Sequence, residues 1–365
     1  MKLAIFGLTI SSSWGNGHAT LWRGLCKALA RNGHRVVFFE RDVPYYRETR
    51  DLFELPGGEL VLYPEWVGAQ AAARRHLADA DVAMVTSYCP DALAATVLVL
   101  ESNVPLRVFY DLDTPVTLAR LAAGEAVDYI GDRGLSDFDL VLSYTGGRSL
   151  ADLQQRLGAR RVAPLYGSVD PEIHKPVVSD SRYSADLGYL GTYAADRNAA
   201  LQKLLIEPAR LLPERRFIIA GSMYDQGFPW RENIFFVSHL PPADHSAFYC
   251  STRLTLNVTR RAMAETGYCP SGRLFEAAAC GAAMLSDSWE GLHQFFEPGS
   301  EILVAENTEA AVAALDRSPE DLARIAAAAR ERTLAENTAA VRAVQLEEIL
   351  DSAVARVAAS GGEAF

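Results

Sequence analysis

The chain has 365 residues, of which 49% are hydrophobic and 22% are charged, so it can bury the cores of two domains. Its 35 basic and 46 acidic residues give a formal net charge of −11, which disfavours nucleic acid or an anionic membrane surface as the main partner. The five cysteines are scattered and include no C-x-x-C pair. We therefore expect a reducing, cytoplasmic location, and neither a disulfide framework nor a zinc site.

The first half of the chain alternates short apolar runs with amphipathic segments, which is typical of a parallel, doubly wound sheet. The predicted strands cover residues 3–6, 36–40, 60–63, 82–86, 107–111, 140–143 and 161–165, and the predicted helices lie near 18–31, 69–78, 91–101, 115–122 and 146–157. The N-terminal apolar run is short and is followed by three serines, so it predicts a strand rather than a signal peptide. No apolar run approaches the ~20 residues that span a bilayer.

The alternation breaks at residues 164–176, whose prolines, glycine and polar residues predict a linker. We therefore expect an N-terminal domain over residues 1–168 and a second domain over residues 169–339. In the second domain, strands are predicted at 185–191, 216–220, 234–237, 254–257, 282–286 and 302–304, with helices at 196–211, 242–250, 271–280 and 289–296. The Ala-rich tail after residue 308 is expected to be helical.

Residues 269–287 are the most informative stretch. Ser271–Gly272 marks a helix start, where the Ser271 side chain can cap backbone N–H groups, and Gly281 marks its end. A helix start attracts anions, and Arg273 in the first turn is favourable there if a phosphate binds nearby. Glu276 lies one turn further along, where its carboxylate can accept hydrogen bonds from sugar hydroxyls. The alternative is that Arg273 and Glu276 are solvated side chains of an amphipathic helix.

The small-residue turn followed by Glu276-Ala-Ala-Ala-Cys-Gly281 resembles the donor-binding helix of GT-B glycosyltransferases, the group-1 nucleotide-sugar enzymes. More narrowly, residues 191–197, 270–276 and 291–296 resemble the CgeB-type family. The resemblance is strong over most of the C-terminal half and weaker over the N-terminal half. It departs at Tyr268, eight residues before Glu276, where the group-1 motif has another glutamate.

The resemblance implies an α/β protein with the GT-B fold, in which two Rossmann-like doubly wound domains face each other across a cleft. It also implies that a C-terminal helix at about 340–358 packs back on the N-terminal, acceptor-binding domain. Glu276 would hold the ribose of the nucleotide. Arg197 would contact the donor diphosphate, and residues near His239 and Leu240 would lie against the base. A surface salt bridge is the alternative for Arg197, and a structural role is the alternative for His239.

Polar residues also follow several predicted strands of the second domain. Because parallel strands end at one edge of a sheet, these residues are expected to meet Arg273 in a cationic donor pocket. The predicted donor-binding residues at these strand ends are Gly191, Thr192, Ser222, Tyr224 and Arg260, besides Ser271 and Gly272.

A second glycine-containing loop, with Gly15 and Gly17, joins the first strand to the first helix. Its glycines allow a ligand to approach the backbone, so both are predicted to bind the donor. The loop lacks the full dinucleotide fingerprint, which disfavours a nicotinamide cofactor. His18, directly after the loop, is a candidate general base, or else an ordinary histidine near a helix start.

Asp111 and Asp113 lie at the carboxyl end of a predicted strand. Either carboxylate could orient or deprotonate an acceptor hydroxyl, or both could hydrogen-bond local backbone in a turn. The Asp-X-Asp pattern also resembles the metal motif of GT-A glycosyltransferases. The two-domain pattern favours GT-B over GT-A, so we expect no metal.

These observations predict a metal-independent glycosyltransferase with His18, Asp111, Asp113, Arg197 and Arg273 as its candidate catalytic residues. It would move a sugar from a nucleoside diphosphate sugar, with a UDP-sugar expected, to an unidentified hydroxyl-bearing acceptor. No separate cofactor is expected, and the group-1 resemblance implies retention of the anomeric configuration. The alternatives are an inverting transferase, a sugar-nucleotide epimerase, and a non-catalytic GT-B protein with a binding or coat-assembly role.

Overall fold

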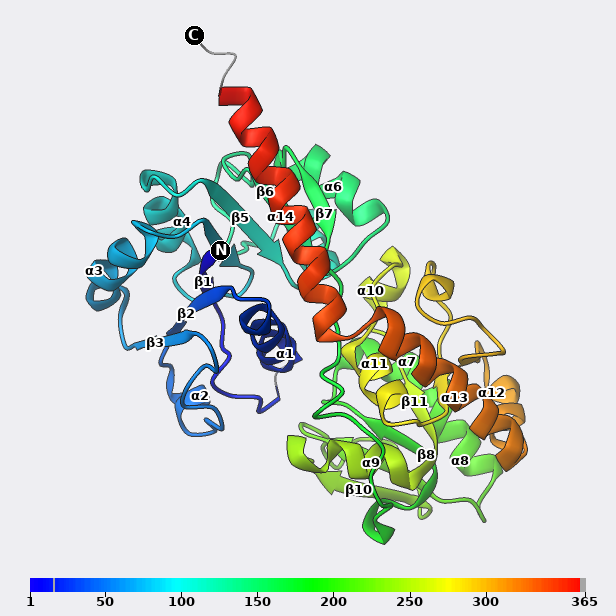
Figure 1. The fold of residues 1–365 in the computed structure, drawn as a ribbon. Helices are drawn as coiled ribbons and strands as arrows, with labels where there is room; N and C mark the ends of the chain where they lie inside the picture. The colour runs from blue at the N-terminus through cyan, green and yellow to red at the C-terminus, as the bar shows by residue number, and fades with distance from the viewer. Residues whose placement is uncertain (16, 362–365) are drawn as a thin grey trace. The chain divides into compact units, whose positions relative to one another are not determined.

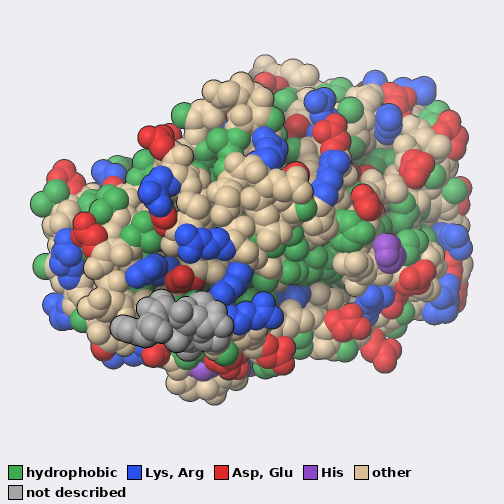
Figure 2. All heavy atoms as spheres, turned by 90° about the horizontal axis from the view of Figure 1, so that it is seen from above, with side chains coloured by type: hydrophobic (Ala, Val, Ile, Leu, Met, Phe, Trp, Pro, Cys, Tyr) green, Lys and Arg blue, Asp and Glu red, His purple; other side chains and the backbone are tan. Residues whose placement is uncertain are grey.

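The computed structural model describes residues 1–15 and 17–361, with side chains described up to residue 357. The chain folds into two compact units (Figure 1). The first unit contains residues 1–167 and the segment that begins at Ala339, and the second contains residues 168–338. Acidic and basic side chains are interspersed on the face that Figure 2 shows, in keeping with the acidic composition.

The first unit is built on a seven-stranded parallel sheet with the order β3-β2-β1-β4-β5-β6-β7. The strands are β1 (Lys2–Gly7), β2 (Arg35–Arg41), β3 (Glu59–Tyr63), β4 (Val82–Thr86), β5 (Leu106–Asp111), β6 (Leu140–Ser143) and β7 (Val162–Pro164). The order reverses where β1 pairs with β4, which is the switch point at which open α/β sheets bind ligands. The loops after β1 and β4 therefore flank this switch point.

Helices cover both faces of this sheet, because its strands are apolar on both sides. They are α1 (Gly17–Arg31), α2 (Pro44–Arg47), α3 (Trp66–Leu77), α4 (Ala92–Glu101), α5 (Thr114–Ala122), α6 (Arg148–Leu157) and α14 (Ala339–Gly361). Helices α1 and α14 pack side by side on one face, where Leu25, Leu346 and Leu350 share one core. Residues of α3 and α4 line the core of the other face.

The second unit contains a six-stranded parallel sheet with the order β10-β9-β8-β11-β12-β13. The strands are β8 (Ala185–Leu190), β9 (Phe217–Gly221), β10 (Ile234–Ser238), β11 (Thr252–Asn257), β12 (Met284–Ser286) and β13 (Leu303–Val304). Its α-helices are α7 (Asn198–Leu201), α8 (Glu207–Leu211), α9 (His245–Ser251), α10 (Arg261–Thr266), α11 (Gly272–Ala279), α12 (Thr308–Leu315) and α13 (Pro319–Glu336). Two parallel sheets with helices confirm the predicted α/β class.

Two predicted helices of the second unit differ from the structure. The segment 196–211 begins as the 3-10 turn η2 (Ala195–Arg197) and contains a π-helical stretch, η3 (Gln202–Ile206), between α7 and α8. Pro208, just after this stretch, has no N–H and crowds the preceding turn, which explains the irregular bonding. The helix expected over 289–296 is only the 3-10 turn η5 (Leu292–Gln294), because Gly291 before it has a φ of +88°.

Among the described helices, none combines the length and the apolar character needed to cross a membrane.

Candidate functional site

Helix α11 presents its first turn at the carboxyl edge of the second sheet. Its N-cap residue, Ser271, has an extended backbone, but its side chain makes no capping hydrogen bond within the described part of the chain. The expectation that the Ser271 side chain caps this helix is therefore wrong. Leu274 and Phe275 bury the apolar face, and Gly281 with a φ of +76° follows the helix end. The first-turn N–H groups are thus not occupied by the Ser271 hydroxyl and suit an anion.

Arg273 is held in place by the ends of two strands. Its Nε donates to the backbone oxygen of Leu190, at the end of β8, and its Nη1 donates to Oδ1 of Asn257, at the end of β11, across 2.8 Å. Its guanidinium carbon also lies 5.2 Å from the ring centroid of Tyr189. The alternative of a freely solvated arginine is therefore wrong, since these contacts fix the guanidinium at the sheet edge.

Arg197 lies close to two other cations. Its Nη1 donates to the backbone oxygen of Thr192 across 3.2 Å, and its buried Nε has no hydrogen-bond partner among the described residues. Burial, together with the positive charges of Arg273 and Arg260, lowers the pKa of Arg197. The neighbouring Asp196 pairs with Arg260 at 3.0 Å. Arg197, Arg260 and Arg273, which we call the arginine cluster, would gain from a bound anion.

The loops after β8 and β9 meet at the same edge. Tyr224 donates from its hydroxyl to the backbone oxygen of Gly191 across 3.0 Å, and the hydroxyls of Thr192 and Ser222 lie 3.3 Å apart. A Cβ atom on Gly221, which has a φ of +156°, would lie 2.1 Å from the Gly191 oxygen, so only glycine allows this approach. The structure therefore brings these four predicted donor-binding residues together.

His239 and Leu240 directly follow β10. The backbone N–H of His239 donates to the backbone oxygen of Gly221 across 2.9 Å, which joins this loop to the end of β9. His239 has a φ of +54°, and burial lowers the pKa of its imidazole. Leu240 is buried, and its carbonyl accepts a hydrogen bond from the imidazole of His245.

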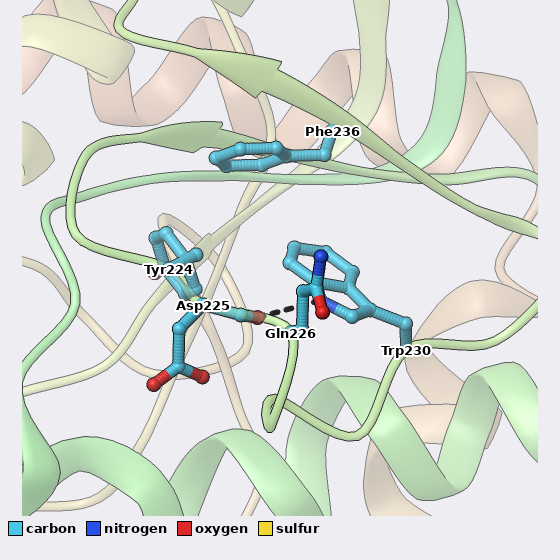
Figure 3. Close-up of a pocket in the computed structure, with 5 residues that line it drawn as sticks. All are labelled: Tyr224, Asp225, Gln226, Trp230 and Phe236. Atoms are coloured by element: carbon cyan, nitrogen blue, oxygen red, sulfur yellow. Dashed lines mark hydrogen bonds between the residues drawn. The ribbon is translucent and has the colours of Figure 1, made fainter.

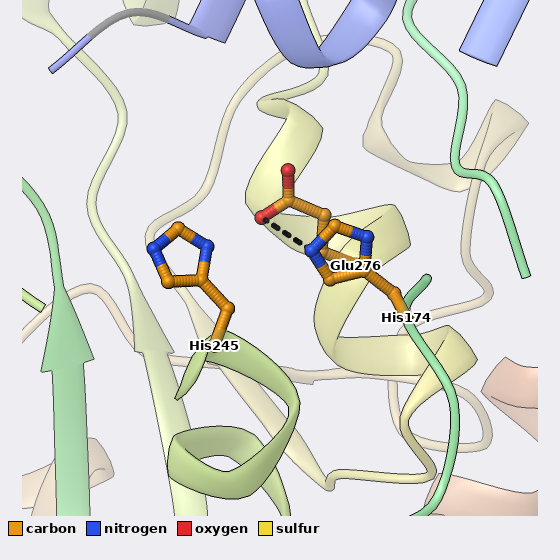
Figure 4. Close-up of side chains that lie close together, drawn as sticks. All are labelled: His174, His245 and Glu276. Carbon is orange, nitrogen blue, oxygen red and sulfur yellow. Dashed lines mark ion pairs between the residues drawn. The ribbon is translucent and has the colours of Figure 1, made fainter. Parts of the chain in front are cut away.

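Glu276 points toward His174 and His245 (Figure 4). The Tyr249 hydroxyl donates to its Oε2 across 3.1 Å, and Nε2 of His174 lies 4.0 Å from the same oxygen. Burial by itself would raise the pKa of Glu276, but the charges of His174 and His245, the Tyr249 hydrogen bond and the charge of Arg273 together lower the pKa. Burial lowers the pKa of His245, with Glu276 opposing the change. The sequence analysis singled out neither histidine, because neither lies in a recognisable motif.

His174, His245 and Glu276 also contain the atom types that bind a metal ion. One nitrogen or oxygen of each residue lies within 4.8 Å of the others. Around a tetrahedral zinc ion with bonds of about 2.05 Å, ligand atoms are roughly 3.3 Å apart. At 4.0 Å, Nε2 of His174 and Oε2 of Glu276 lie farther apart than two such ligand atoms.

In the first unit, a buried carboxylate fixes the loop between β1 and α1. Glu40, at the end of β2, is fully buried and accepts hydrogen bonds from the Thr9 hydroxyl, the Ile10 N–H and both the N–H and the hydroxyl of Ser11. The sequence analysis did not single out Glu40. Gly15, in the same loop, has a φ of +60°, and Gly17 begins α1.

Asp113 and His18 lie near each other in this unit, whereas Asp111 turns inward. Nε2 of His18 lies 3.7 Å from Oδ2 of Asp113. Asp111 is fully buried, and its Oδ1 accepts hydrogen bonds from the Asp113 N–H and the Thr117 hydroxyl, each across 3.1 Å. Burial raises the pKa of Asp111 to about 6 in spite of these bonds. Asp111 thus hydrogen-bonds local backbone in a turn, which is the alternative that the sequence left open for it.

An open aromatic cavity of about 570 Å³ lies between the β9–β10 loop and β10 (Figure 3). The ring centroids of Trp230 and Phe236 are 5.1 Å apart, and the Trp230 Nε1 donates to the backbone oxygen of Asp225 across 3.0 Å. The lining residues are Tyr224, Asp225, Gln226, Trp230 and Phe236. Of these, the sequence analysis had predicted only Tyr224 to bind a ligand.

Comparisons with known proteins bear on the fold and the family. Residues 197–348 match a family model described as glycosyl transferase-like. No curated protein sequence matches the chain. Among solved structures, a sucrose-phosphate synthase from Thermosynechococcus elongatus has 15% identity and a TM-score of 0.69, with 97% of this chain and 99% of that chain covered.

Two further solved structures, both complexes with UDP or UDP-glucose, are similar over their whole length. Anabaena HepE in complex with UDP-glucose has 14% identity and a TM-score of 0.65, with 96% of this chain and 100% of that chain covered. An alpha-glucosyltransferase in complex with UDP has 12% identity and a TM-score of 0.70, with 96% of this chain and 100% of that chain covered.

The similarity in fold extends over both sheets, and the family match includes α11 with Arg273 and Glu276. The predicted pair of Rossmann-like domains is therefore confirmed. The chain has the GT-B fold, and its residues 197–348 match the family model described as glycosyl transferase-like.

Proposed function

We propose that this protein is a glycosyltransferase that uses a UDP-sugar donor and binds the donor diphosphate at the arginine cluster, beside the first turn of α11. The observation that carries the proposal is the position of Arg197. Its guanidinium is partly buried, one of its nitrogens has no partner among the described residues, and Arg260 and Arg273 lie close enough to lower its pKa. A diphosphate would pair with all three cations and offset their repulsion.

The same cluster suggests how the reaction is accelerated. Negative charge develops on the leaving diphosphate as the bond to the sugar breaks, and cations fixed in advance stabilise that charge without reorganising. Arg273 is fixed by Leu190 and Asn257, and Arg197 by Thr192. We propose that Arg197 and Arg273 perform this role without a metal ion.

The remaining donor contacts follow from the same edge of the sheet. We propose that Glu276 binds the ribose with Oε1, since Tyr249 already donates to Oε2. The backbone near His239 and Leu240 would contact the base, and uracil is supported by the two similar structures that were solved in complex with UDP-glucose or UDP. Membership of the CgeB-type branch is part of this proposal and is supported by the residues of α11 and of the Gly191 loop.

We propose a retaining reaction with a hydroxyl-bearing acceptor. The alternative is an inverting reaction, which is favoured by the 3.7 Å distance between Nε2 of His18 and Oδ2 of Asp113. In an inverting transferase, His18 would be the general base, and Asp113 would orient it.

Thermal-shift and calorimetric measurements with UDP, ADP, GDP and UDP-glucose test the donor. A ligand that binds only the folded state raises the melting temperature, so UDP and UDP-glucose should stabilise the protein more than ADP or GDP do. If none of the four binds, the proposal is wrong. Tight UDP binding without hydrolysis or transfer of the sugar would instead support a non-catalytic protein, and conversion of the donor sugar to its epimer would support an epimerase.

A further inference from the structure

Cys250 and Cys280 bring two thiols together in the second unit. Cys250 is the next-to-last residue of α9, and Cys280 directly follows α11 as its C-cap residue. Sγ of Cys250 donates to the backbone oxygen of Cys280 across 3.5 Å, and Sγ of Cys280 lies 3.6 Å from the Ser246 hydroxyl oxygen. Ser246 and Cys250 are four positions apart on α9 and therefore share one face of the helix. The Cys280 side chain thus packs against the face of α9 that carries Cys250.

The two thiols also contact each other. The Cys280 thiol donates a hydrogen bond to the Cys250 sulfur, and the Val177 N–H donates to the same sulfur across 3.4 Å. The hydrogen bond from Cys280, together with that from Val177, lowers the pKa of Cys250 against the effect of burial. The same contact with Cys250, together with burial, raises the pKa of Cys280. Because the thiolate is the nucleophilic form of cysteine, Cys250 is the nucleophile of the pair.

Cys250 is also the cysteine that an oxidant in solution can reach. Of the five cysteines, all of which lie in the described ranges, Cys250 is partly exposed, and Cys26, Cys89, Cys269 and Cys280 are buried. Burial raises the pKa of Cys26 and of Cys89 to about 12, so both thiols stay protonated near neutral pH. An oxidant therefore meets Cys250 before the other thiols.

A metal site does not explain the pair. Zinc sites in proteins use three or four protein ligands. Among the described residues, the one group of three potential ligand residues is His174, His245 and Glu276, and neither cysteine belongs to it. An accessible cysteine with a lowered pKa beside a second, buried cysteine is instead the arrangement of a redox-sensitive thiol with its resolving partner.

We propose that Cys250 is a site of oxidation by hydrogen peroxide and that Cys280 then forms a disulfide with it, which joins α9 to α11. The Cys250 sulfur attacks one oxygen of the peroxide, the O–O bond breaks, and the departing hydroxide takes the Cys250 proton and becomes water. The Cys280 sulfur then attacks the sulfur of the Cys250 sulfenic acid, the S–O bond breaks, and hydroxide leaves with the Cys280 proton as a second water. Overall, the two thiols lose two electrons and two protons, and one peroxide is reduced to two waters.

The disulfide should also affect the donor site. An S–S bond is about 2.05 Å long, which is shorter than the contact of two hydrogen-bonded sulfurs, so its formation draws the ends of α9 and α11 together. Tyr249, next to Cys250, donates to Glu276, which lies four positions before Cys280. The oxidised protein should therefore bind UDP more weakly. This consequence rests on the proposed nucleotide donor, whereas the disulfide itself does not.

The test exposes the whole chain to hydrogen peroxide and then measures its mass and its free thiols under denaturing conditions. The wild-type protein should lose two hydrogen atoms and two free thiols, and proteolytic mapping should place the new bond between Cys250 and Cys280. Dithiothreitol should reverse both changes. Cys280→Ser should instead gain one oxygen atom at Cys250, which dimedone captures as the sulfenic acid, and Cys250→Ser should keep its mass and its thiols.

Cys269→Ala is the matched control, because it removes a buried cysteine of the same unit and should form the disulfide as the wild-type protein does. The inference is overturned if peroxide leaves the wild-type thiols intact, joins a different pair of cysteines, or takes Cys250 to the sulfinic acid without a disulfide. These measurements on the wild-type protein decide the question even if a serine variant does not fold.

Calorimetry with UDP separates the disulfide from its effect on the donor site. Oxidation of the wild-type protein should raise the Kd of UDP by about two- to tenfold, the effect of losing one hydrogen bond, and peroxide treatment of Cys250→Ser should leave the Kd unchanged. Equal affinities of the reduced and the disulfide form would refute the effect on the donor site and leave the disulfide intact. If UDP binds neither form, the proposed donor is wrong, and the mass measurements still decide whether the disulfide forms.

Discussion

The Tyr249 hydroxyl lies 3.1 Å from Oε2 of Glu276 and joins α9 to α11. Tyr249 is almost completely buried, and Glu276 is partly buried. The hydrogen bond restricts the rotation of the carboxylate, so Oε1 has a defined direction. A residue that resembles the ribose-binding glutamate of group-1 enzymes is therefore already oriented by the fold.

Deleting the hydrogen bond from Tyr249 to Glu276 should weaken nucleotide binding. Tyr249→Phe keeps the ring in the core but deletes the hydroxyl, so we expect UDP affinity to fall by about 0.5–1.5 kcal/mol, the net value of one hydrogen bond. Calorimetry measures the change. Tyr183→Phe, which deletes the hydroxyl that bonds Asp244, is the control. Equal UDP affinities in wild type and Tyr249→Phe would show that Glu276 does not need this contact.

Deleting the Glu276 carboxylate should have a larger effect. Glu276→Ala should weaken UDP binding by about 1.5–3 kcal/mol, because a hydrogen bond to a charged group is lost. Glu265→Ala is the matched control, since Glu265 is an exposed glutamate of the same unit that pairs with Arg261. Unchanged affinity in a folded Glu276→Ala variant would remove this residue from the nucleotide site.

The arginine cluster should matter more for turnover than for folding. Arg197→Ala and Arg273→Ala should each lower kcat by about 10²–10³-fold, the usual effect of losing one group that stabilises developing charge. Arg→Lys at either position should recover only part of the rate, because lysine lacks the planar fork of donors. Steady-state rates of sugar transfer or donor hydrolysis measure this.

The control for these variants is Arg210→Ala, which removes an exposed arginine paired with Glu207. Melting temperatures separate a catalytic effect from a loss of structure, since Arg273 also holds two strand ends together. Wild-type turnover in either cluster variant would exclude that arginine from the reaction.

Asp111 predicts a pH dependence of stability. Burial raises its pKa from 3.8 to about 6, so between these values the folded state holds a proton that the unfolded state has released. The stabilisation is complete below the unfolded pKa and is lost as the pH rises through about 6. The loss between pH 4 and pH 7 should be on the order of 2–3 kcal/mol.

Asp111→Asn should remove this loss. Chemical denaturation at pH 4, 5, 6 and 7 should therefore show stability falling less with pH in Asp111→Asn than in the wild-type protein. Asp128→Asn, which replaces an exposed carboxylate of the same unit, is the matched control. If stability falls equally with pH in the wild-type protein and in Asp111→Asn, the Asp111 carboxyl has the same pKa in the folded and the unfolded state.

The stereochemistry can be tested with His18. A retaining transferase needs no strong base, so His18→Ala should keep measurable transfer activity, whereas an inverting enzyme should lose on the order of a hundredfold or more. NMR of the anomeric centre of the product identifies the configuration directly. An inverted product together with a large loss in His18→Ala would replace the retaining mechanism with the inverting one.

The sequence alone identified the features that depend on local chemistry. Alternating apolar and amphipathic runs predicted two parallel α/β units, because side-chain periodicity follows from backbone geometry. The helix over residues 271–280 was predicted from its own signals, and the structure places it at Gly272–Ala279. The irregular segment at 196–211 was missed, because the position of Pro208 does not reveal how the preceding turn rearranges.

Tertiary structure decided which polar groups meet. The arginine cluster combines the 3-10 turn η2, the segment between β11 and α10 and the first turn of α11, which only the parallel strand order brings to one edge. His174 and His245 are 71 positions apart in the sequence, and their approach to Glu276 depends on how the segment before β8, the start of α9 and α11 pack together. Glu40 likewise lies in no recognisable sequence motif. In the folded chain its carboxylate accepts hydrogen bonds from Thr9, Ile10 and Ser11 in the loop between β1 and α1. Electrostatic contacts of this kind depend on distance in space, which periodicity and local propensity do not encode.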